Sequence, residues 1–291
     1  MRLVINDAPG GAPDVAARLI GEWLSVRLGQ PFIAENRPGG GGNIGTEAVV
    51  RSPPDGYTLL VVSTTTAINA TVYENLNFNL ISDVAPVSGI VRFPLVMVIN
   101  PSFPAKTIAE FIACAKANPG KLNMASAGNG TGPHVAGELF KMMAGIDMVH
   151  VPYRGGPAAL TAVLGGQADV YFVASSSSIQ FISAGKLIPL AVTTAARWQG
   201  LPNVPALVEF VPGYEASVWF GIGAPKSTPT EVVNELNREI NAGLIDPKLG
   251  ARFADIGGTV MTGSPAVFGK LIADETEKWA KVVKSSGAKP D

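Results

Sequence analysis

Reactive side chains are scarce in this 291-residue sequence, which contains one cysteine and two histidines. Cys114 on its own forms neither an intrachain disulfide nor a metal site built from several cysteines. His134 and His150 are the available imidazoles, and two histidines without cysteine partners do not make up a zinc ligand set. We therefore expect a protein that uses neither a metal ion nor a cofactor.

Charge is also low, because charged residues make up 15% of the chain and the net charge is −1. Lys and Arg are scattered along the sequence, whereas proteins that bind nucleic acid concentrate them on one face. Nucleic acid is therefore not an expected partner. No uninterrupted apolar run reaches the roughly 20 residues that a membrane-spanning helix needs.

Catalytic motifs are missing or incomplete. Ser126 lies in MASAG, which lacks the first glycine of the G-x-S-x-G nucleophile motif. The run from Gly40 to Gly45, GGGNIG, matches the G-x-G-x-x-G pattern of dinucleotide sites. Pro53 and Pro54 leave little room for the usual crossover helix, and no acidic residue follows at about 20 residues. We expect a connecting loop, and an α/β enzyme that binds a phosphate or dinucleotide there is the alternative.

Apolar residues are abundant, at 47%, and their spacing predicts strands that alternate with helices. Strands are expected at residues 3–6, 31–35, 59–62, 95–99, 122–125, 148–153, 169–173 and 188–193. Helices are expected from residue 12, from the capping box at residues 107–110, at 134–144, 157–164 and 179–184, from residue 228, and at 265–284. This alternation predicts an α/β fold with mainly parallel sheets flanked by helices.

Length indicates two lobes, because single cores stop growing at roughly 250–300 residues. Proline-rich breaks near residues 100–104 and 202–212 mark the expected passages between the lobes. We predict a discontinuous domain 1 at residues 1–99 plus 219–291 and an inserted domain 2 at residues 100–218. Two crossing strands would act as a hinge, and the cleft between the lobes is a favoured place for a small ligand.

Loops of small residues repeatedly lead from a predicted strand into a helix. They lie at residues 10–14, 63–67, 127–132 and 153–158, with 175–178 as a fifth candidate. Backbone N–H groups and the positive end of the helix dipole attract anions at such places. Glycine and serine also simply terminate strands, but four such loops in one chain favour a cleft that closes on an anion.

Six motifs together resemble one known family. They are ENRPG at residues 35–39, PDGYTLL at 54–60, HVPYRG at 150–155, GGQAD at 165–169, LAVT at 190–193 and PGYE at 212–215. The chain resembles, over essentially its full length, the Bug or TctC-like substrate-binding proteins of tripartite tricarboxylate transporters. The resemblance implies a two-lobed, type II periplasmic binding protein fold and a periplasmic location, with an export signal that this sequence does not contain.

The resemblance also implies the ligand site, in which backbone N–H groups, small hydroxyls and water hold a carboxylate. The implied contacts are Gly11, Ala12, Asp14, Ser63 and Thr66 from the first lobe and Ser126, Thr131, His134, Tyr153, Gly156 and Ala158 from the second. Asp14 would act through a water or a ligand amino group, and stabilising the first helical turn is an equal alternative for it. His150, within a strand, is expected to be structural.

At two places the sequence differs from the family that it resembles, and both differences concern ligand choice. Asn6 and Asp7 stand where the family usually has an aromatic residue, and Val173 and Ala174 stand where an aspartate is common. We expect both places to border the cleft.

We thus expect a monomeric binding protein, not an enzyme. It would capture a di-, tri- or aromatic carboxylate by hinge closure and deliver it to a membrane permease. A sensory role, in which a membrane receptor detects the liganded protein, is a further alternative.

Overall fold

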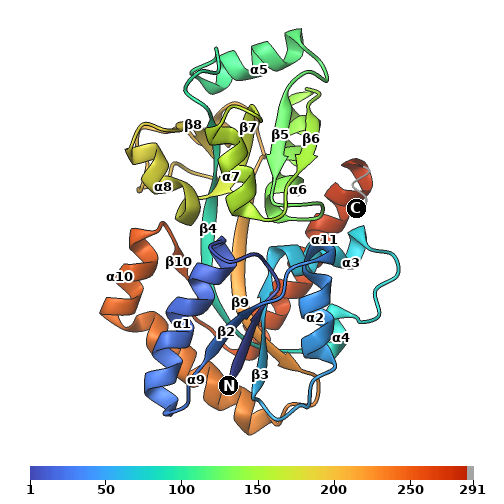
Figure 1. Ribbon diagram of the computed structural model, residues 1–291, viewed down its shortest axis with the longest axis vertical. Coiled ribbons are helices and arrows are strands. Elements are labelled where there is room, and N and C mark those ends of the chain that lie inside the picture. Colours follow the sequence, from blue (N-terminus) through green and yellow to red (C-terminus); the bar gives the residue numbers. More distant parts are fainter. Residues whose placement is uncertain (287–291) are drawn as a thin grey trace.

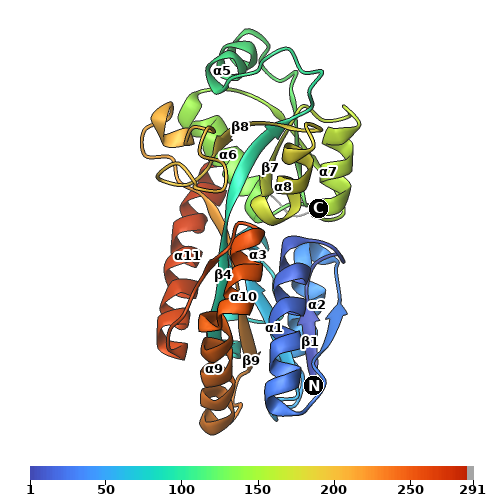
Figure 2. The same ribbon diagram turned by 90° about the vertical axis from the view of Figure 1, so that its left-hand side faces the viewer.

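The computed structural model describes residues 1–286; residues 287–291, the end of the predicted domain 1, lie outside this range. Figures 1 and 2 show two lobes stacked along the long axis and connected by two strands, β4 (Val84–Ile99) and β9 (Ser217–Pro225). The expected α/β fold with two lobes is confirmed.

The first lobe holds the beginning and the end of the described chain. Its elements are β1 (Arg2–Ile5), α1 (Ala12–Leu28), β2 (Ile33–Asn36), the 3-10 turn η1 (Gly40–Gly42), α2 (Asn43–Val50), β3 (Thr58–Ser63), α3 (Thr64–Val72), α4 (Leu80–Asp83), α9 (Thr230–Ile245), α10 (Pro247–Asp255), β10 (Thr259–Val260) and α11 (Pro265–Ser286).

The second lobe is built from the middle of the chain. Its elements are α5 (Ile108–Ala117), β5 (Asn123–Ser126), α6 (Gly132–Ala144), β6 (Val149–Pro152), α7 (Gly156–Leu164), β7 (Val170–Ala174), α8 (Ser175–Ser183), β8 (Ile188–Val192) and the 3-10 turn η2 (Leu207–Glu209).

Each lobe has a parallel set of three strands whose carboxyl ends lead into the loops between the lobes. In the first lobe β1 pairs in parallel with β2 and β3, and in the second β5 pairs in parallel with β6 and β7. The predicted parallel pairing is correct for these strands. The connecting strands differ, because β9 runs antiparallel to β3 and β4, and β4 runs antiparallel to β7, β8 and β10.

Strand β4 extends well beyond the strand predicted at residues 95–99. Pro86, Gly89 and Pro94 lie within it, and its pairing with β9 has two register irregularities. Proline and glycine weaken the sequence pattern of a strand, and bulges accommodate them. Strand β9 was not predicted either, because Gly221 and Gly223 interrupt its apolar run.

The passage between the lobes follows from the partners of β4. Residues 84–94 pair with β9, and residues 95–99 pair with β7 and β8. The partner change lies at Pro94 and Leu95, a few residues before the boundary predicted at 99. The domain limits at 99/100 and 218/219 stay a prediction.

Helix α11 contacts elements of both lobes, namely α3, β4 and α6, and Figure 2 shows it lying along the connecting strands. No helix within residues 1–286 combines the length and the apolar character that spanning a membrane would require.

Candidate functional site

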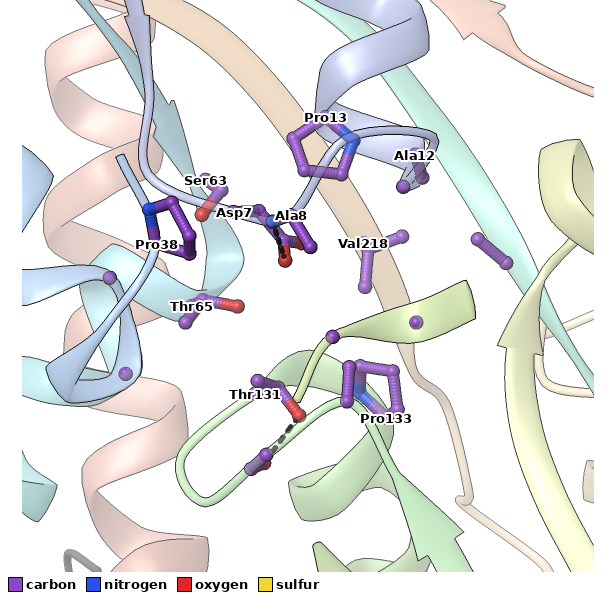
Figure 3. Close-up of a pocket in the computed structure, with 18 of the residues that line it drawn as sticks. Asp7, Ala8, Ala12, Pro13, Pro38, Ser63, Thr65, Thr131, Pro133 and Val218 are labelled. Atoms are coloured by element: carbon purple, nitrogen blue, oxygen red, sulfur yellow. Dashed lines mark hydrogen bonds between the residues drawn. The ribbon is translucent and has the colours of Figure 1, made fainter. Parts of the chain in front are cut away.

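A cavity of about 490 Å³ lies between the two lobes. This volume is in the range of small-molecule sites. Figure 3 shows the arrangement, with Pro13, Ser63 and Thr65 contributed by the first lobe and Thr131 and Pro133 by the second. Val218 of the connecting strand β9 completes the wall.

Five helices begin at this cavity. The residues that precede the first turns of α1, α3, α6, α7 and α8 all line it: Gly11, Ser63, Thr131, Gly155 and Ala174. The first N–H groups of a helix have no partner within the helix, and the helix dipole makes this end positive. In four of the five no side chain caps the helix start, Ser63 at α3 being the exception. This arrangement suits an anion contacted by both lobes.

Six of the eleven predicted site residues line the cavity: Gly11, Ala12, Ser63, Thr131, Tyr153 and Gly156. Their common feature is position, since each lies within two residues of a helix start or at the end of a strand.

Asp14 and Thr66 lie behind the wall and hold its loops in place. Asp14 accepts hydrogen bonds from the Gly10 N–H at 2.9 Å and from Arg18 Nε at 3.0 Å. Burial acts to raise the pKa of Asp14, but Arg18 and the Gly10 N–H outweigh it and the pKa lies below its ordinary value. Thr66 Oγ1 accepts from the Ser63 N–H and thereby closes the capping box of α3.

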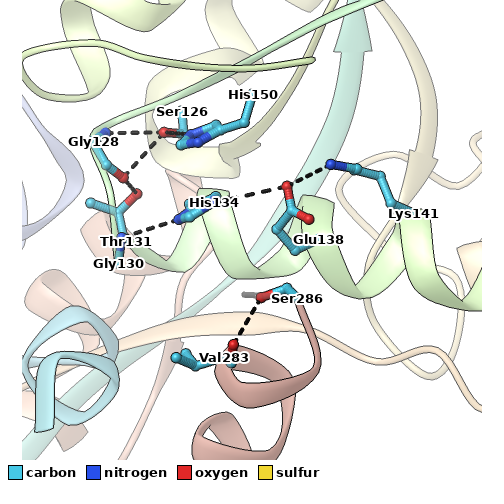
Figure 4. A network of polar contacts seen from close by, with 10 residues as sticks. All are labelled: Ser126, Gly128, Gly130, Thr131, His134, Glu138, Lys141, His150, Val283 and Ser286. Carbon is cyan, nitrogen blue, oxygen red and sulfur yellow. Dashed lines mark hydrogen bonds and ion pairs between the residues drawn. The ribbon is translucent and has the colours of Figure 1, made fainter. Parts of the chain in front are cut away.

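Ser126 and His134 belong to a polar network beneath the cavity, shown in Figure 4. Ser126 Oγ lies 2.6 Å from Nε2 of His150, and Ser126 is fully buried. His134 Nδ1 accepts from the Gly130 N–H at 3.1 Å, and its ring stacks on that of His150. The network fixes the loop at residues 127–131, which carries lining residues. His150, which we expect to be structural, belongs to this network and does not line the cavity.

Ala158, the last predicted contact, is exposed on α7 and does not line the cavity. Several lining residues were missed by the sequence analysis: Ala8, Thr65, Tyr171, Ser177, Val218 and Phe220. Thr65 and Ser177 had a usable signal, because both lie in the first turn of a helix that begins at the cavity. Val218 and Phe220 had none, since their strand was not predicted.

The two places where the sequence differs from its family border the cavity, as expected. The residues there, Asn6, Asp7, Val173 and Ala174, all line it. Asp7 is the acidic residue among the lining residues of the described chain, and Arg154 is the basic one. Burial raises the pKa of Asp7, the Ala8 N–H opposes this, and the charge of Asp14 adds to it.

The glycine-rich run from Gly40 to Gly45 lines the cavity with Gly40, Gly41 and Gly42 and packs closely against neighbouring backbone at Gly42 and Gly45. A Cβ on Gly42 would lie 2.8 Å from the backbone oxygen of Asn6, and one on Gly45 would lie 2.8 Å from that of Arg37. These glycines allow η1 and α2 to pack against the first strands, so the run serves as a connection. The nucleotide alternative gains no support from this geometry.

Two lobes, two connecting strands and an interlobe cavity at five helix starts define a two-lobed solute-binding protein. The chain belongs to the tripartite tricarboxylate transporter family receptors, whose family model matches residues 16–288. Members of this family are receptors for transported solutes, so the chain is a receptor and not an enzyme.

Individual relatives agree over the full length. Protein BugT of Bordetella pertussis is 35% identical over 292 residues, covering 99% of this chain and 90% of BugT. A solved structure of an R. palustris protein with adipate is 35% identical, with a TM-score of 0.96 over 100% of this chain and 98% of the other. MatC from Rhodopseudomonas palustris with bound malate is 29% identical, with a TM-score of 0.92 over 97% and 98%.

Proposed function

We propose that this protein is a periplasmic receptor that captures a small carboxylate in the interlobe cavity and presents it to a membrane permease. The observation that carries the proposal is the meeting of five helix starts from both lobes at one cavity. Relatives that were solved with adipate and with malate support the ligand class.

The carboxylate would be held by backbone N–H groups and small hydroxyls rather than by a cluster of basic side chains. Gly11, Ala12, Ser63, Thr131 and Gly156 are the proposed direct contacts, and Tyr153 lines the wall beside them. Asp14, Thr66, Ser126 and His134 would act by positioning these loops, as their hydrogen bonds indicate. Ala158 would be part of the first turn of α7 without contacting the ligand.

Capture would proceed by hinge closure of a monomer. One lobe binds the carboxylate first, and the N–H groups of the other lobe then stabilise the closed form, so that the ligand shifts the population towards it. The moving parts would be residues 1–99 plus 219–291 and residues 100–218, with β4 and β9 as the hinge. The permease would recognise the closed surface.

A thermal-shift screen of di-, tri- and aromatic carboxylates tests the proposal. A ligand at about 100 times its dissociation constant adds about 2.7 kcal/mol to the free energy of unfolding. Thr65→Asp places a fixed carboxylate at the second residue of α3, where the helix dipole favours it, but in the wall of the cavity. We expect this variant to fold and to lose the carboxylate-induced shift.

Thr230→Asp is the matched control, because it makes the same change in the exposed first turn of α9, outside the cavity lining. It should keep the full shift. Stabilisation by no carboxylate, or equal shifts in the two variants, would show that the helix starts at the cavity do not bind the ligand.

A further inference from the structure

Asp7 is an acidic side chain in the wall of a cavity that is otherwise suited to anions. Its Oδ1 accepts a hydrogen bond from the Ala8 N–H at 2.7 Å, and Figure 3 shows this contact within the cavity lining. Within residues 1–286 no Lys, Arg or His nitrogen forms an ion pair with Asp7. Asp14, in the same turn region, differs because Arg18 pairs with it.

The second lobe lies directly across from Asp7. A Cβ on Gly155 would stand 3.5 Å from Asp7 Oδ1, and one on Gly156 would stand 3.5 Å from the Tyr171 hydroxyl. Burial raises the pKa of Tyr171, and the charge of Asp7 raises it further. Asp7 therefore faces Tyr171 and the start of α7 at the place where both lobes would surround a ligand.

This placement leaves the Asp7 carboxylate short of donors. An ionised carboxylate offers about four acceptor positions, and the Ala8 N–H occupies one. Water can fill the others while the cavity is open, but closure removes water, and unpaired buried acceptors cost free energy. A ligand with carboxylates alone would add like-charge repulsion. A hydroxyl or ammonium group on the ligand would supply the missing donor.

We propose that Asp7 is a specificity-determining residue that accepts a hydrogen bond from a hydroxyl or ammonium group of the ligand, so that the protein prefers hydroxy- or amino-substituted carboxylates. This inference rests on the proposed carboxylate-binding function and narrows its ligand class. The hydroxyl and the ammonium group share the role of donor, and the experiment below separates them.

Calorimetric titration of two matched series tests the proposal. Succinate, malate and aspartate share a four-carbon diacid and carry hydrogen, hydroxyl or ammonium at the second carbon. Adipate, 2-hydroxyadipate and 2-aminoadipate form the same series with six carbons. We expect a substituted acid to bind at least about tenfold more tightly than the unsubstituted acid of equal length.

Variants of Asp7 test whether this residue causes the preference for substituted acids. Asp7→Ala should reduce it to less than about threefold, because the acceptor is gone. Asp7→Asn keeps an accepting oxygen without the charge, so it should retain a preference for hydroxyl and lose one for ammonium. Asp274→Asn, which alters an exposed partner of Lys270 on α11, is the control and should bind like the wild type.

Three outcomes overturn the inference while the proposed function stands. These are equal binding of substituted and unsubstituted acids, a preference that survives Asp7→Ala, and tight succinate or adipate binding with uptake of one proton. Proton uptake is measured by titration in two buffers of different ionisation enthalpy, and it would show that a proton neutralises Asp7. Binding of none of the six acids would overturn the inference for these diacids, whereas the proposed function is contradicted only if the thermal-shift screen of di-, tri- and aromatic carboxylates also finds no ligand.

Discussion

His134 and His150 lie face to face at the base of the second lobe, with ring centroids 3.7 Å apart and planes 8° apart. Burial, together with the neighbouring His150 and Lys141, lowers the pKa of His134 to about 3. Burial and Lys141 lower the pKa of His150 to about 4. Both rings are therefore neutral near pH 7, which permits the stack and lets His134 Nδ1 accept from Gly130.

This pair predicts how stability depends on pH. Because both folded-state pKa values lie below the ordinary 6.5, the unfolded chain binds more protons between about pH 6.5 and pH 4. The free energy of unfolding should fall as the pH falls through that window, by up to about 1.4 kcal/mol per pH unit for each histidine. Urea unfolding from about pH 7 to about pH 4.5 measures the slope.

Comparing two variants with the wild type separates the contribution of the histidines to the slope. His150→Gln keeps a polar partner for Ser126 and should give a shallower slope. Asp7 acts in the opposite direction, since its raised pKa lets the folded protein bind a proton first. Asp7→Asn should therefore steepen the slope, and identical slopes in all three proteins would contradict the assignment.

For single residues, the sequence does not separate those that line the cavity from those that hold its loops in place. Ser126 and His134 have the side chains expected of a binding site, but their neighbours His150 and Gly130 come from other segments and place them beneath the cavity. Asp7 was identified as a departure, and its lack of a cation became apparent only in the fold. Such distinctions depend on tertiary contacts and not on local pattern.

Among the elements, helix α7 begins at a place where the two lobes come close together. Gly155 precedes it with φ +94°, a conformation that residues with a side chain rarely adopt. A Cβ at Gly155 would lie 2.7 Å from the Cβ of Ala8 in the first lobe, closer than two carbon atoms can approach. Glycine here permits the loops at residues 7–11 and 153–157 to meet.

Gly155→Ala should therefore weaken ligand binding. The added methyl group strains the backbone, at about 1–3 kcal/mol, and also separates the two loops across the cavity. We expect the affinity for a carboxylate to fall by at least about tenfold, measured by calorimetric titration.

Gly166→Ala serves as the matched control, since Gly166 has φ +70° and no atom within 4 Å of an added Cβ. It should lose stability without losing affinity. Equal affinities of the two variants would mean that the contact of the loops is not part of the bound state.

Most elements of both lobes could be predicted, because capping and apolar spacing are local signals. The capping box at Thr107 and Glu110 is present as expected, with hydrogen bonds of 3.2 Å in both directions. The connecting strands could not be predicted, because Pro86, Pro94 and Gly221 interrupt the apolar pattern and these strands are held by long-range pairing, with a register irregularity at Pro86. The part of the site on β9 was missed for the same reason.

Over the whole molecule, helix α11 is tied to the connecting strand β9 through one buried carboxylate. Glu275 Oε2 accepts from Nε1 of Trp219 on β9 at 3.1 Å and from Nε1 of Trp279 on α11 at 2.9 Å. All three side chains are buried. The indole rings therefore place α11 at a fixed position beside the hinge.

Glu275→Leu should be strongly destabilising, because it leaves two indole N–H groups buried without an acceptor. Each costs about 1–3 kcal/mol, which urea unfolding would detect as a lower midpoint. Glu275→Gln retains an accepting oxygen and should lose less. Glu277→Gln, which alters an exposed ion pair with Lys281, should change the midpoint little; a similar loss in this variant would argue against the role of the indole pair.

The five helix starts at the cavity have a consequence for the evolution of ligand choice. The N–H groups that would hold the carboxylate belong to the main chain, and no substitution other than proline deletes a main-chain N–H. Mutations at wall positions such as Asp7, Val173 and Ala174 therefore alter what else a ligand must carry while leaving its anchor intact. A receptor of this design can change its ligand preference through a few wall substitutions. None of the intermediate variants would need to lose carboxylate binding.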